Sequence, residues 1–310
     1  MTIVVAGGTG LAGSAIVRAY QATGAEVIAL NRSVVDLLDR DATTAYLKKT
    51  KPTLVVDAAA KVGGIGANNA FPVEFLSDNV RIQSNLMEAA HAADVEKFIF
   101  LGSSCIYPRD CAQPIKEEYL LTGPLEETNS AYAIAKIAGI ELIKSFRKEY
   151  GRTWISLMPT NLYGPNDNFE LKGSHVLPAF IRRFVEAAEK KVATETLWGT
   201  GSPKREFLHV DDLATAVVHL GANYNSSDHI NIGTGEDLTI KALAELVAQL
   251  AGFEGEIAWD SSKPDGTPRK VLDVSKAKSL GWAPKISLSD GIASTIAWYK
   301  DASAKGVARR

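Results

Sequence analysis

The chain has 310 residues, of which 46% are hydrophobic and 23% charged, and its formal net charge is −2. This length is enough for one large and one smaller domain, and the composition is that of an ordinary globular protein. The balanced charge offers no basic stripe, so we expect no nucleic-acid partner, and no apolar run reaches the length of a membrane span. Cys105 and Cys111 are too few for a disulfide framework and too closely placed to suggest a structural metal site. A cytoplasmic protein without a metal is therefore expected.

The first two-thirds of the chain alternates short β-branched runs with helical patterns. The patterns predict helices at residues 14–23, 80–92 and 131–150. They predict strands at residues 3–6, 26–30, 54–58, 97–101 and 154–158. Strands that alternate with helices in this way pair in parallel. The sequence therefore predicts an α/β fold with a Rossmann-type, doubly wound parallel sheet.

The texture of the sequence changes after Pro159, where Asn, Gly and Pro become frequent. A helix is predicted at 176–191. The run 207–220 is expected to return to the first domain, with Asp211 and Asp212 capping its helix.

These changes in pattern predict two domains that share the chain unevenly. The first, Rossmann-type domain is expected to comprise residues 1–165 and about 207–225. The second, a smaller α/β substrate-binding domain, is expected to comprise residues about 166–206 and 226–310.

Glycines follow the first expected strand at a spacing of three residues. They form the pattern G-x-x-G-x-x-G directly between a strand and a helix. The early glycines permit a tight turn and a close approach of the backbone to a diphosphate, and the helix N-terminus faces this anion. The pattern therefore predicts a dinucleotide-binding loop made of Gly7, Gly8, Thr9, Gly10, Leu11, Ala12 and Gly13.

The tip of the second expected strand indicates which dinucleotide binds. An NAD site usually places an acid there for the ribose 2′-hydroxyl, but this chain has Asn31 and Arg32. Arg32 can pair with a 2′-phosphate, which favours NADP(H). Asp36 and Asp39 come late for the ribose role, and Asp39 is expected beside the adenine.

A tyrosine and a lysine four residues apart lie on the helix expected at 131–150. Tyr132 and Lys136 share one face of that helix, so both should point into one pocket. A cation beside a phenol favours the phenolate, and the pair is a usable proton donor and acceptor. Ser103 follows the strand at 97–101, at the sheet edge where ligands bind, and its hydroxyl can hold a substrate carbonyl. We expect Tyr132 to donate a proton there while Lys136 holds the nicotinamide ribose.

These motifs resemble those of the extended short-chain dehydrogenase/reductases, which act on nucleotide sugars. Further segments are similar to the GDP-L-fucose synthases, a family of bifunctional epimerase-reductases: AAAKVGGI at 58–65, LGSSCIYP at 101–108, PTNLYGP at 159–165 with DNF at 167–169, and KPDGTPRK at 263–270. The resemblance implies NADPH-dependent conversion of GDP-4-keto-6-deoxy-D-mannose to GDP-L-fucose, by epimerisation at C3 and C5 and reduction at C4. It also implies an NADP-binding first domain, a GDP-sugar-binding second domain and a homodimer.

The resemblance assigns roles to particular residues. It places the base-and-acid pair of the epimerisation at Cys105 and His175, which would remove an α-proton and deliver one to the opposite face. Ser103 and Tyr132 would hold the enolate oxygen between these steps. The residues expected beside the cofactor's nicotinamide end are Pro159, Asn161, Leu162 and His175. Those expected to grip the GDP-sugar are Arg183, Trp198, Arg205, Asp265 and Lys270.

Alternative functions stay open at this stage. A 4-reductase of the same or a related keto sugar would need neither Cys105 nor His175, and a GDP-colitose-type synthase would use a further deoxygenated sugar. A catalytically silent NADP-binding regulator would not need Ser103. The other histidines are expected to be structural or solvated; they are His91, His209, His219 and His229.

Overall fold

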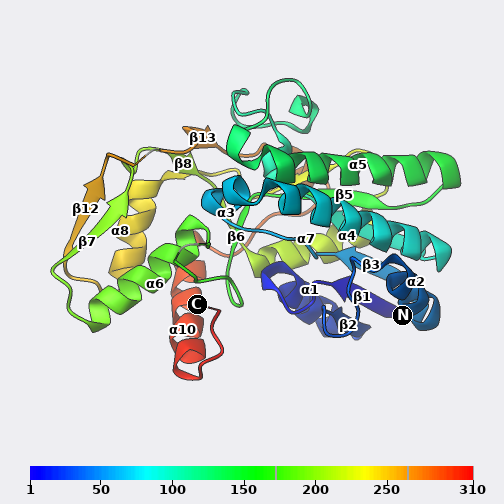
Figure 1. Ribbon diagram of the computed structural model, residues 1–310, viewed down its shortest axis with the longest axis horizontal. Helices are drawn as coiled ribbons and strands as arrows, with labels where there is room; N and C mark the ends of the chain where they lie inside the picture. The colour runs from blue at the N-terminus through cyan, green and yellow to red at the C-terminus, as the bar shows by residue number, and fades with distance from the viewer. Residues whose placement is uncertain (172, 264, 310) are drawn as a thin grey trace.

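The computed structural model describes residues 1–171, 173–263 and 265–309, and it has two lobes (Figure 1). Pro264, part of one segment quoted above, lies outside the described residues. The larger lobe contains a six-stranded sheet in the order β10-β5-β4-β3-β1-β2, with every neighbouring pair parallel. Its strands are β1 (Thr2–Ala6), β2 (Glu26–Leu30), β3 (Leu54–Asp57), β4 (Lys97–Leu101), β5 (Ile155–Pro159) and β10 (Ile230–Ile232).

Helices cover both faces of this sheet (Figure 1). One face packs against α1 (Leu11–Ala22) and α7 (Val210–Asn223), and the other against α2 (Arg40–Thr50), α4 (Pro72–Ala92) and α5 (Ser130–Tyr150). Successive strand residues point to opposite faces, so Val56 joins the first core and Val55 the second. The expected doubly wound, Rossmann-type α/β fold is confirmed, and each of the five strands expected in it lies within one residue of its predicted bounds.

The smaller lobe has its own hydrophobic core. Its helices are α6 (Val176–Glu189), α8 (Ile240–Ala251) and α10 (Leu288–Ala304), and its strands are β7 (Thr194–Trp198), β8 (Lys204–Arg205), β11 (Leu238–Thr239), β12 (Glu256–Asp260) and β13 (Arg269–Lys270). The short strands β6 (Asn161–Tyr163) and β9 (Phe207–His209) pair with each other. Strand β10 belongs to the large sheet although its residues fall in the range expected for the second domain. The proposed division of the chain stays a prediction.

Several helices of the large lobe differ from the sequence-based expectation: α1 begins three residues early, at Leu11, and α3 (Ile65–Ala70) was not expected. Helix α4 begins at Pro72, well before residue 80, because a proline at the first helical position gives up an N–H that would have no partner there. Helix α2 was not expected at all. It is capped by Asp39, whose side chain accepts a hydrogen bond from Ala42 N at 2.9 Å.

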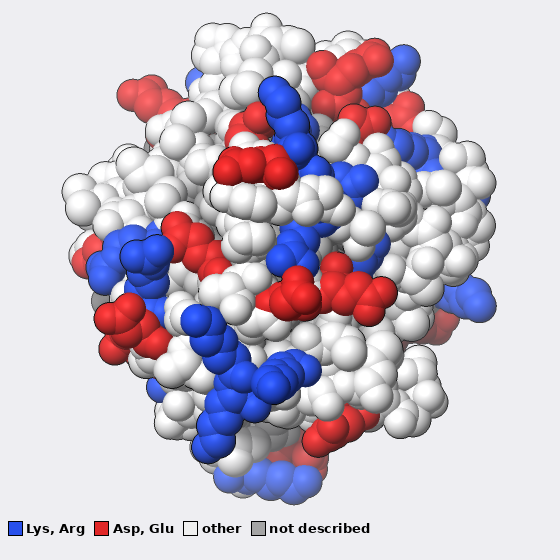
Figure 2. Space-filling view, turned by 90° about the vertical axis from the view of Figure 1, so that its right-hand side faces the viewer, with Lys and Arg blue, Asp and Glu red and all other residues white. Residues whose placement is uncertain are grey.

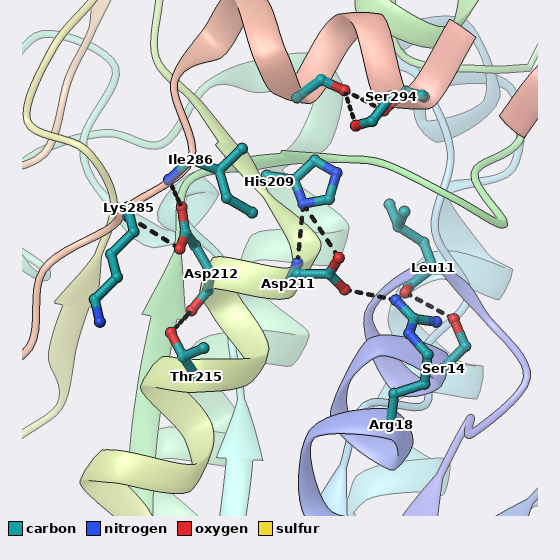
Figure 3. Close-up of polar contacts among 12 residues, drawn as sticks. Leu11, Ser14, Arg18, His209, Asp211, Asp212, Thr215, Lys285, Ile286 and Ser294 are labelled. Atoms are coloured by element: carbon teal, nitrogen blue, oxygen red, sulfur yellow. Dashed lines mark hydrogen bonds and ion pairs between the residues drawn. The ribbon is translucent and has the colours of Figure 1, made fainter. Parts of the chain in front are cut away.

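Helix α7 is capped by a histidine rather than by an aspartate (Figure 3). The His209 side chain accepts a hydrogen bond from Asp211 N at 3.2 Å, which corrects the expectation that Asp211 and Asp212 cap this helix. Asp212 is buried and accepts hydrogen bonds from the backbone N–H groups of Lys285 and Ile286, at 3.0 and 2.9 Å. The exposed Asp211 pairs with Arg18 of α1 at 2.5 Å. Asp212 therefore ties the segment ahead of α10 to the large lobe.

The surface carries both signs of charge. Figure 2 shows Lys and Arg side chains next to Asp and Glu over one side of the molecule. Among the described residues, no helix is both long and apolar enough to cross a membrane.

The two neighbouring aspartates of α7 should differ sharply in their effect on stability. Asp212→Ala leaves two backbone donors without their acceptor and should lower the free energy of unfolding by about 3 kcal/mol. Asp211→Ala, the matched control, loses an exposed ion pair and should cost about 0.5 kcal/mol. Urea denaturation of both variants checks this, and equal losses would contradict the role given to Asp212.

Candidate active site

The glycine loop connects β1 to α1 at the carboxyl edge of the sheet. Gly7 has a φ of +71°, and a Cβ there would lie 2.7 Å from Ala58 O, so only glycine fits. Gly13 has no room for a Cβ against the Gly7 carbonyl. Gly10 is the N-cap of α1 and offers no side chain to its first-turn N–H groups. These groups are therefore open to an anion, and the loop fits the diphosphate of a dinucleotide.

Arg32 follows β2 at the place expected for a 2′-phosphate contact. Its side chain is mostly exposed and pairs with Asp36 at 3.2 Å. A backbone hydrogen bond from Leu38 N lowers the pKa of Asp36, and so does Arg32. Asp39 is used by the cap of α2, so its carboxylate is fixed beside that helix.

Helix α5 approaches β4 closely at Gly139. A Cβ on Gly139 would collide with the ring of Phe100, so this contact needs glycine. One turn earlier, Lys136 is only 3% exposed and its Nζ donates a hydrogen bond to Leu101 O at 2.9 Å. The same ammonium lies 4.8 Å from the centroid of the Phe100 ring. The packing of α5 thus places a buried cation at the end of β4.

Tyr132 lies beside this cation, with the Lys136 Nζ 5.9 Å from its ring centroid. Burial raises the pKa of Tyr132, and negative charge at Cys105 and Asp57 acts in the same direction. Tyr132 is therefore a protonated phenol at neutral pH and can donate its proton. Burial lowers the pKa of Lys136, while Asp57 and Cys105 oppose this effect.

Ser103 and Cys105 sit on the turn that follows β4. The Ser103 hydroxyl accepts a hydrogen bond from Cys105 N at 3.3 Å and caps the short helix η1 (Ser104–Ile106). Burial raises the pKa of the Cys105 thiol. Lys270, Ser103 and Lys136 lower it, and the effect of Lys270 is the largest of the three. The structure therefore gathers the predicted Ser103, Cys105, Tyr132 and Lys136 into one polar cluster at the sheet edge.

His175 is the N-cap residue of α6 in the smaller lobe, and its side chain is exposed. Partial desolvation lowers the pKa of its imidazole, so His175 is neutral at pH 7. The turn ahead of it is held by the loop after β3, because Gly64 N donates a hydrogen bond to Gly173 O at 3.1 Å. A Cβ on Gly64 would lie 2.8 Å from Ser174 O, so this loop contact also needs a glycine.

Most residues expected to grip a GDP-sugar lie in the smaller lobe. Lys270 of β13 is the neighbour of Arg205 on β8 and lines the same cavity as Cys105. Asp265 accepts hydrogen bonds from the backbone N–H and the hydroxyl of Thr200, at 3.0 and 2.6 Å. Trp198 is 72% exposed at the end of β7, as a shelf for a flat base would be.

The two arginines of this set are already engaged. Arg183 donates to Glu195 Oε1 at 2.6 Å and to the Thr196 carbonyl, so its guanidinium is held against β7. Arg205 donates to the Thr267 carbonyl at 2.5 Å. Each therefore has a fixed position before any ligand binds.

The residues expected beside the nicotinamide follow the end of β5. Pro159 is the last residue of that strand, opposite Ile232 of β10. Asn161 begins β6, and its side chain donates to Glu206 O at 2.7 Å. Leu162 is partly buried against the first core.

Two buried carboxylates near the cluster were not singled out in the sequence. Asp57 ends β3, and Glu206 follows β8. Glu206 accepts hydrogen bonds from the backbone N–H groups of Thr234, Gly235 and Leu272. Asp57 interrupts the apolar run between Val56 and Ala58, whereas Glu206 directly precedes the apolar pair Phe207 and Leu208. An acid next to buried apolar residues was the available signal.

Comparisons with known proteins give a consistent picture. Residues 3–233 match the model of the NAD dependent epimerase/dehydratase family. The chain is 53% identical over 298 residues to GDP-L-fucose synthase 1 of Arabidopsis thaliana, which covers 96% of this chain and 92% of that protein. It is 48% identical over 307 residues to GDP-L-fucose synthase of Escherichia coli K12, which covers 96% of each. A crystal structure of a GDP-L-fucose synthetase from Naegleria fowleri bound to NADP superimposes with a TM-score of 0.91 at 29% identity, covering 100% of this chain and 96% of that one.

Proposed function

Because the chain belongs to the NAD dependent epimerase/dehydratase family and, within it, to the GDP-L-fucose synthases, we propose that it converts GDP-4-keto-6-deoxy-D-mannose to GDP-L-fucose with NADPH. The observation that carries this proposal is the polar cluster at the sheet edge. Ser103, Tyr132 and Lys136 can bind and protonate a ketone oxygen while a bound NADPH would supply the hydride, and Cys105 adds a further acid-base group within the same cluster.

NADP(H) supplies the hydride for C4 when it is bound. The open N–H groups at the start of α1 hold its diphosphate, and Arg32 holds the 2′-phosphate. Asp39 lies on the adenine side, and Lys136 binds the nicotinamide ribose. The wall around the nicotinamide consists of Pro159, Asn161, Leu162 and His175.

Epimerisation uses Cys105 and His175. The neutral thiol and the neutral imidazole together hold one transferable proton, so one group removes the α-proton while the other delivers a proton to the opposite face. The electron pair of the broken C–H bond moves into the 4-oxygen enolate, which accepts hydrogen bonds from Ser103 and Tyr132. The delivered proton is not the one removed, so C3 and C5 acquire hydrogen from solvent.

Reduction follows on the epimerised ketone. Tyr132 is protonated because burial raises its pKa, and its proton passes to the 4-oxygen as hydride reaches C4. The positive charge of Lys136 stabilises the phenolate that is left. The diphosphate of the substrate meets Lys270, Arg205 and Arg183, while Trp198 covers the base and Asp265 fixes the neighbouring loop.

The proposal includes a cytoplasmic homodimer. Helices α4 and α5 lie side by side on one face of the large lobe (Figure 1). The apolar side chains of Ile134 and Tyr150 of α5 are exposed to solvent. This face is the proposed contact between two copies. Sedimentation that finds only monomer at micromolar concentration would contradict it.

Proton NMR of GDP-4-keto-6-deoxy-D-mannose with enzyme and NADPH in deuterium oxide tests the function directly. We expect GDP-L-fucose with deuterium at C3 and C5. Cys105→Ser should abolish this incorporation while NADPH binding survives, and Cys111→Ser, which changes the other thiol, should behave as wild type. A GDP-D-rhamnose product without deuterium would show a plain 4-reductase and remove Cys105 and His175 from the mechanism.

Tyr132→Phe should slow NADPH oxidation by about a hundredfold or more.

Arg32 should set the preference for NADPH. Arg32→Ala removes a charged contact worth about 1.5–3 kcal/mol, so the Kd for NADPH should rise by about tenfold to a hundredfold while that for NADH stays unchanged. Arg40→Ala is the matched control, because Arg40 is also an exposed arginine paired with a carboxylate, at 2.8 Å from Glu88. Fluorescence titration with both cofactors measures the difference. A parallel loss of NADH affinity would argue that Arg32 acts on the fold instead.

A further inference from the structure

Asp57 is a buried carboxylate for which the proposed mechanism has no use. It ends β3 and lies between Ala6 of β1 and Phe100 of β4 in the register of the sheet. Its side chain is fully buried. Because side chains alternate along a strand, Asp57 shares the face of Val55, which packs against α4 and α5. It therefore points toward the layer that carries Lys136.

The hydrogen bonds of Asp57 are incomplete. Its Oδ1 accepts from Ala59 N at 3.1 Å, whereas its Oδ2 is buried and has no partner in the described part of the chain. Lys136 uses its Nζ to donate to Leu101 O and lies over the Phe100 ring, the strand neighbour of Asp57. The carboxylate thus comes from the strand position next to the residue whose ring the ammonium covers, and each group has hydrogen-bonding capacity to spare.

A buried ammonium loses its hydration and is stable only where nearby negative charge compensates. The groups that act on Lys136 are Asp57 and, when ionised, Cys105, and both favour its charged form. Burial raises the pKa of Cys105, so that thiol is neutral at pH 7. Burial raises the pKa of Asp57 to about 6, while Lys136 and the hydrogen bond from Ala59 N oppose the effect, so Asp57 ionises far more readily than the Cys105 thiol. The compensating charge in the resting site therefore belongs to Asp57.

We propose that Asp57 is a positioning residue that keeps Lys136 charged inside the protein, so that Lys136 can bind the nicotinamide ribose and support Tyr132. The inference rests on the roles proposed above for Lys136 and Tyr132. Besides Asp57 and Lys136 themselves, the titratable groups at this place are Tyr132 of α5 and Cys105 of η1. Asp57 acts through Lys136 and need not touch the substrate.

If Asp57 had only a structural role, replacing it with a neutral residue would leave the pKa of Lys136 unchanged. Asp57→Asn retains an oxygen that can accept from Ala59 N, so the turn after β3 keeps its hydrogen bond. Only the negative charge is lost. Asp57→Ala gives a second neutral variant without an amide, and thermal unfolding confirms that each variant is folded.

The test measures the protonation of Lys136 directly. Trace acetylation of the enzyme at a series of pH values, with mass spectrometry of the peptide that contains Lys136, gives the midpoint at which this amine loses its proton. Asp167→Asn is the matched control. Asp167 is 4% exposed and its Oδ2 also has no partner in the described part of the chain, but it acts on Arg309 rather than on Lys136.

The midpoint should fall by about one pH unit or more in Asp57→Asn and Asp57→Ala, a tenfold change in the acidity of Lys136, and stay unchanged in Asp167→Asn. The alkaline fall of kcat for NADPH oxidation should move to lower pH by a similar amount. The same midpoint in wild type and in both Asp57 variants would overturn the inference. If wild-type enzyme does not turn over the GDP-keto sugar, the proposed function fails, while the acetylation result still decides the role of Asp57.

Discussion

The close contact between α5 and β4 is the constraint on which the rest of the site depends. Gly139 lets the helix backbone approach the Phe100 ring, and this approach brings Lys136 within hydrogen-bond distance of Leu101 O. A glycine inside a helix costs about 1 kcal/mol relative to alanine. In return the helix places an ammonium at the end of β4, where Tyr132 and the Ser103 turn meet. A wider spacing between helix and sheet would leave the cation short of the strand end.

The smaller lobe is held to this site by a buried carboxylate. Glu206 joins β8 to β9 and binds backbone N–H groups from the turn after β10 and from Leu272, just beyond β13. The carbonyl of the same residue accepts from Asn161. Because Arg205 precedes Glu206 and Lys270 lies two residues before Leu272, one carboxylate fixes both basic residues relative to Asn161. The residues proposed to grip the substrate are therefore tied to one of those proposed to lie beside the nicotinamide.

The regular elements and the motif residues could be predicted from the sequence, because strand period, glycine spacing and the Tyr-Lys interval are local patterns. What could not be predicted depends on contacts between distant segments. The contact of Asp212 with Lys285 N and Ile286 N, the fixed guanidinium of Arg183 and the charge proposed for Asp57 each involve a partner far away in sequence or on another strand. Acids that directly adjoin apolar strand residues, as Asp57 and Glu206 do, were a signal available in the sequence.

The burial of Cys105 has a consequence for the chemical durability of the enzyme. Oxidants such as peroxide attack thiolates far faster than thiols, and they must reach the sulfur to do so. Cys105 is 9% exposed and its pKa is raised by burial, so between turnovers it presents neither the ionised form nor an open approach. Sulfenic acid formation is thereby confined to the moments when the sulfur is ionised. Burial therefore protects from oxidants the thiol for which we propose an acid-base role.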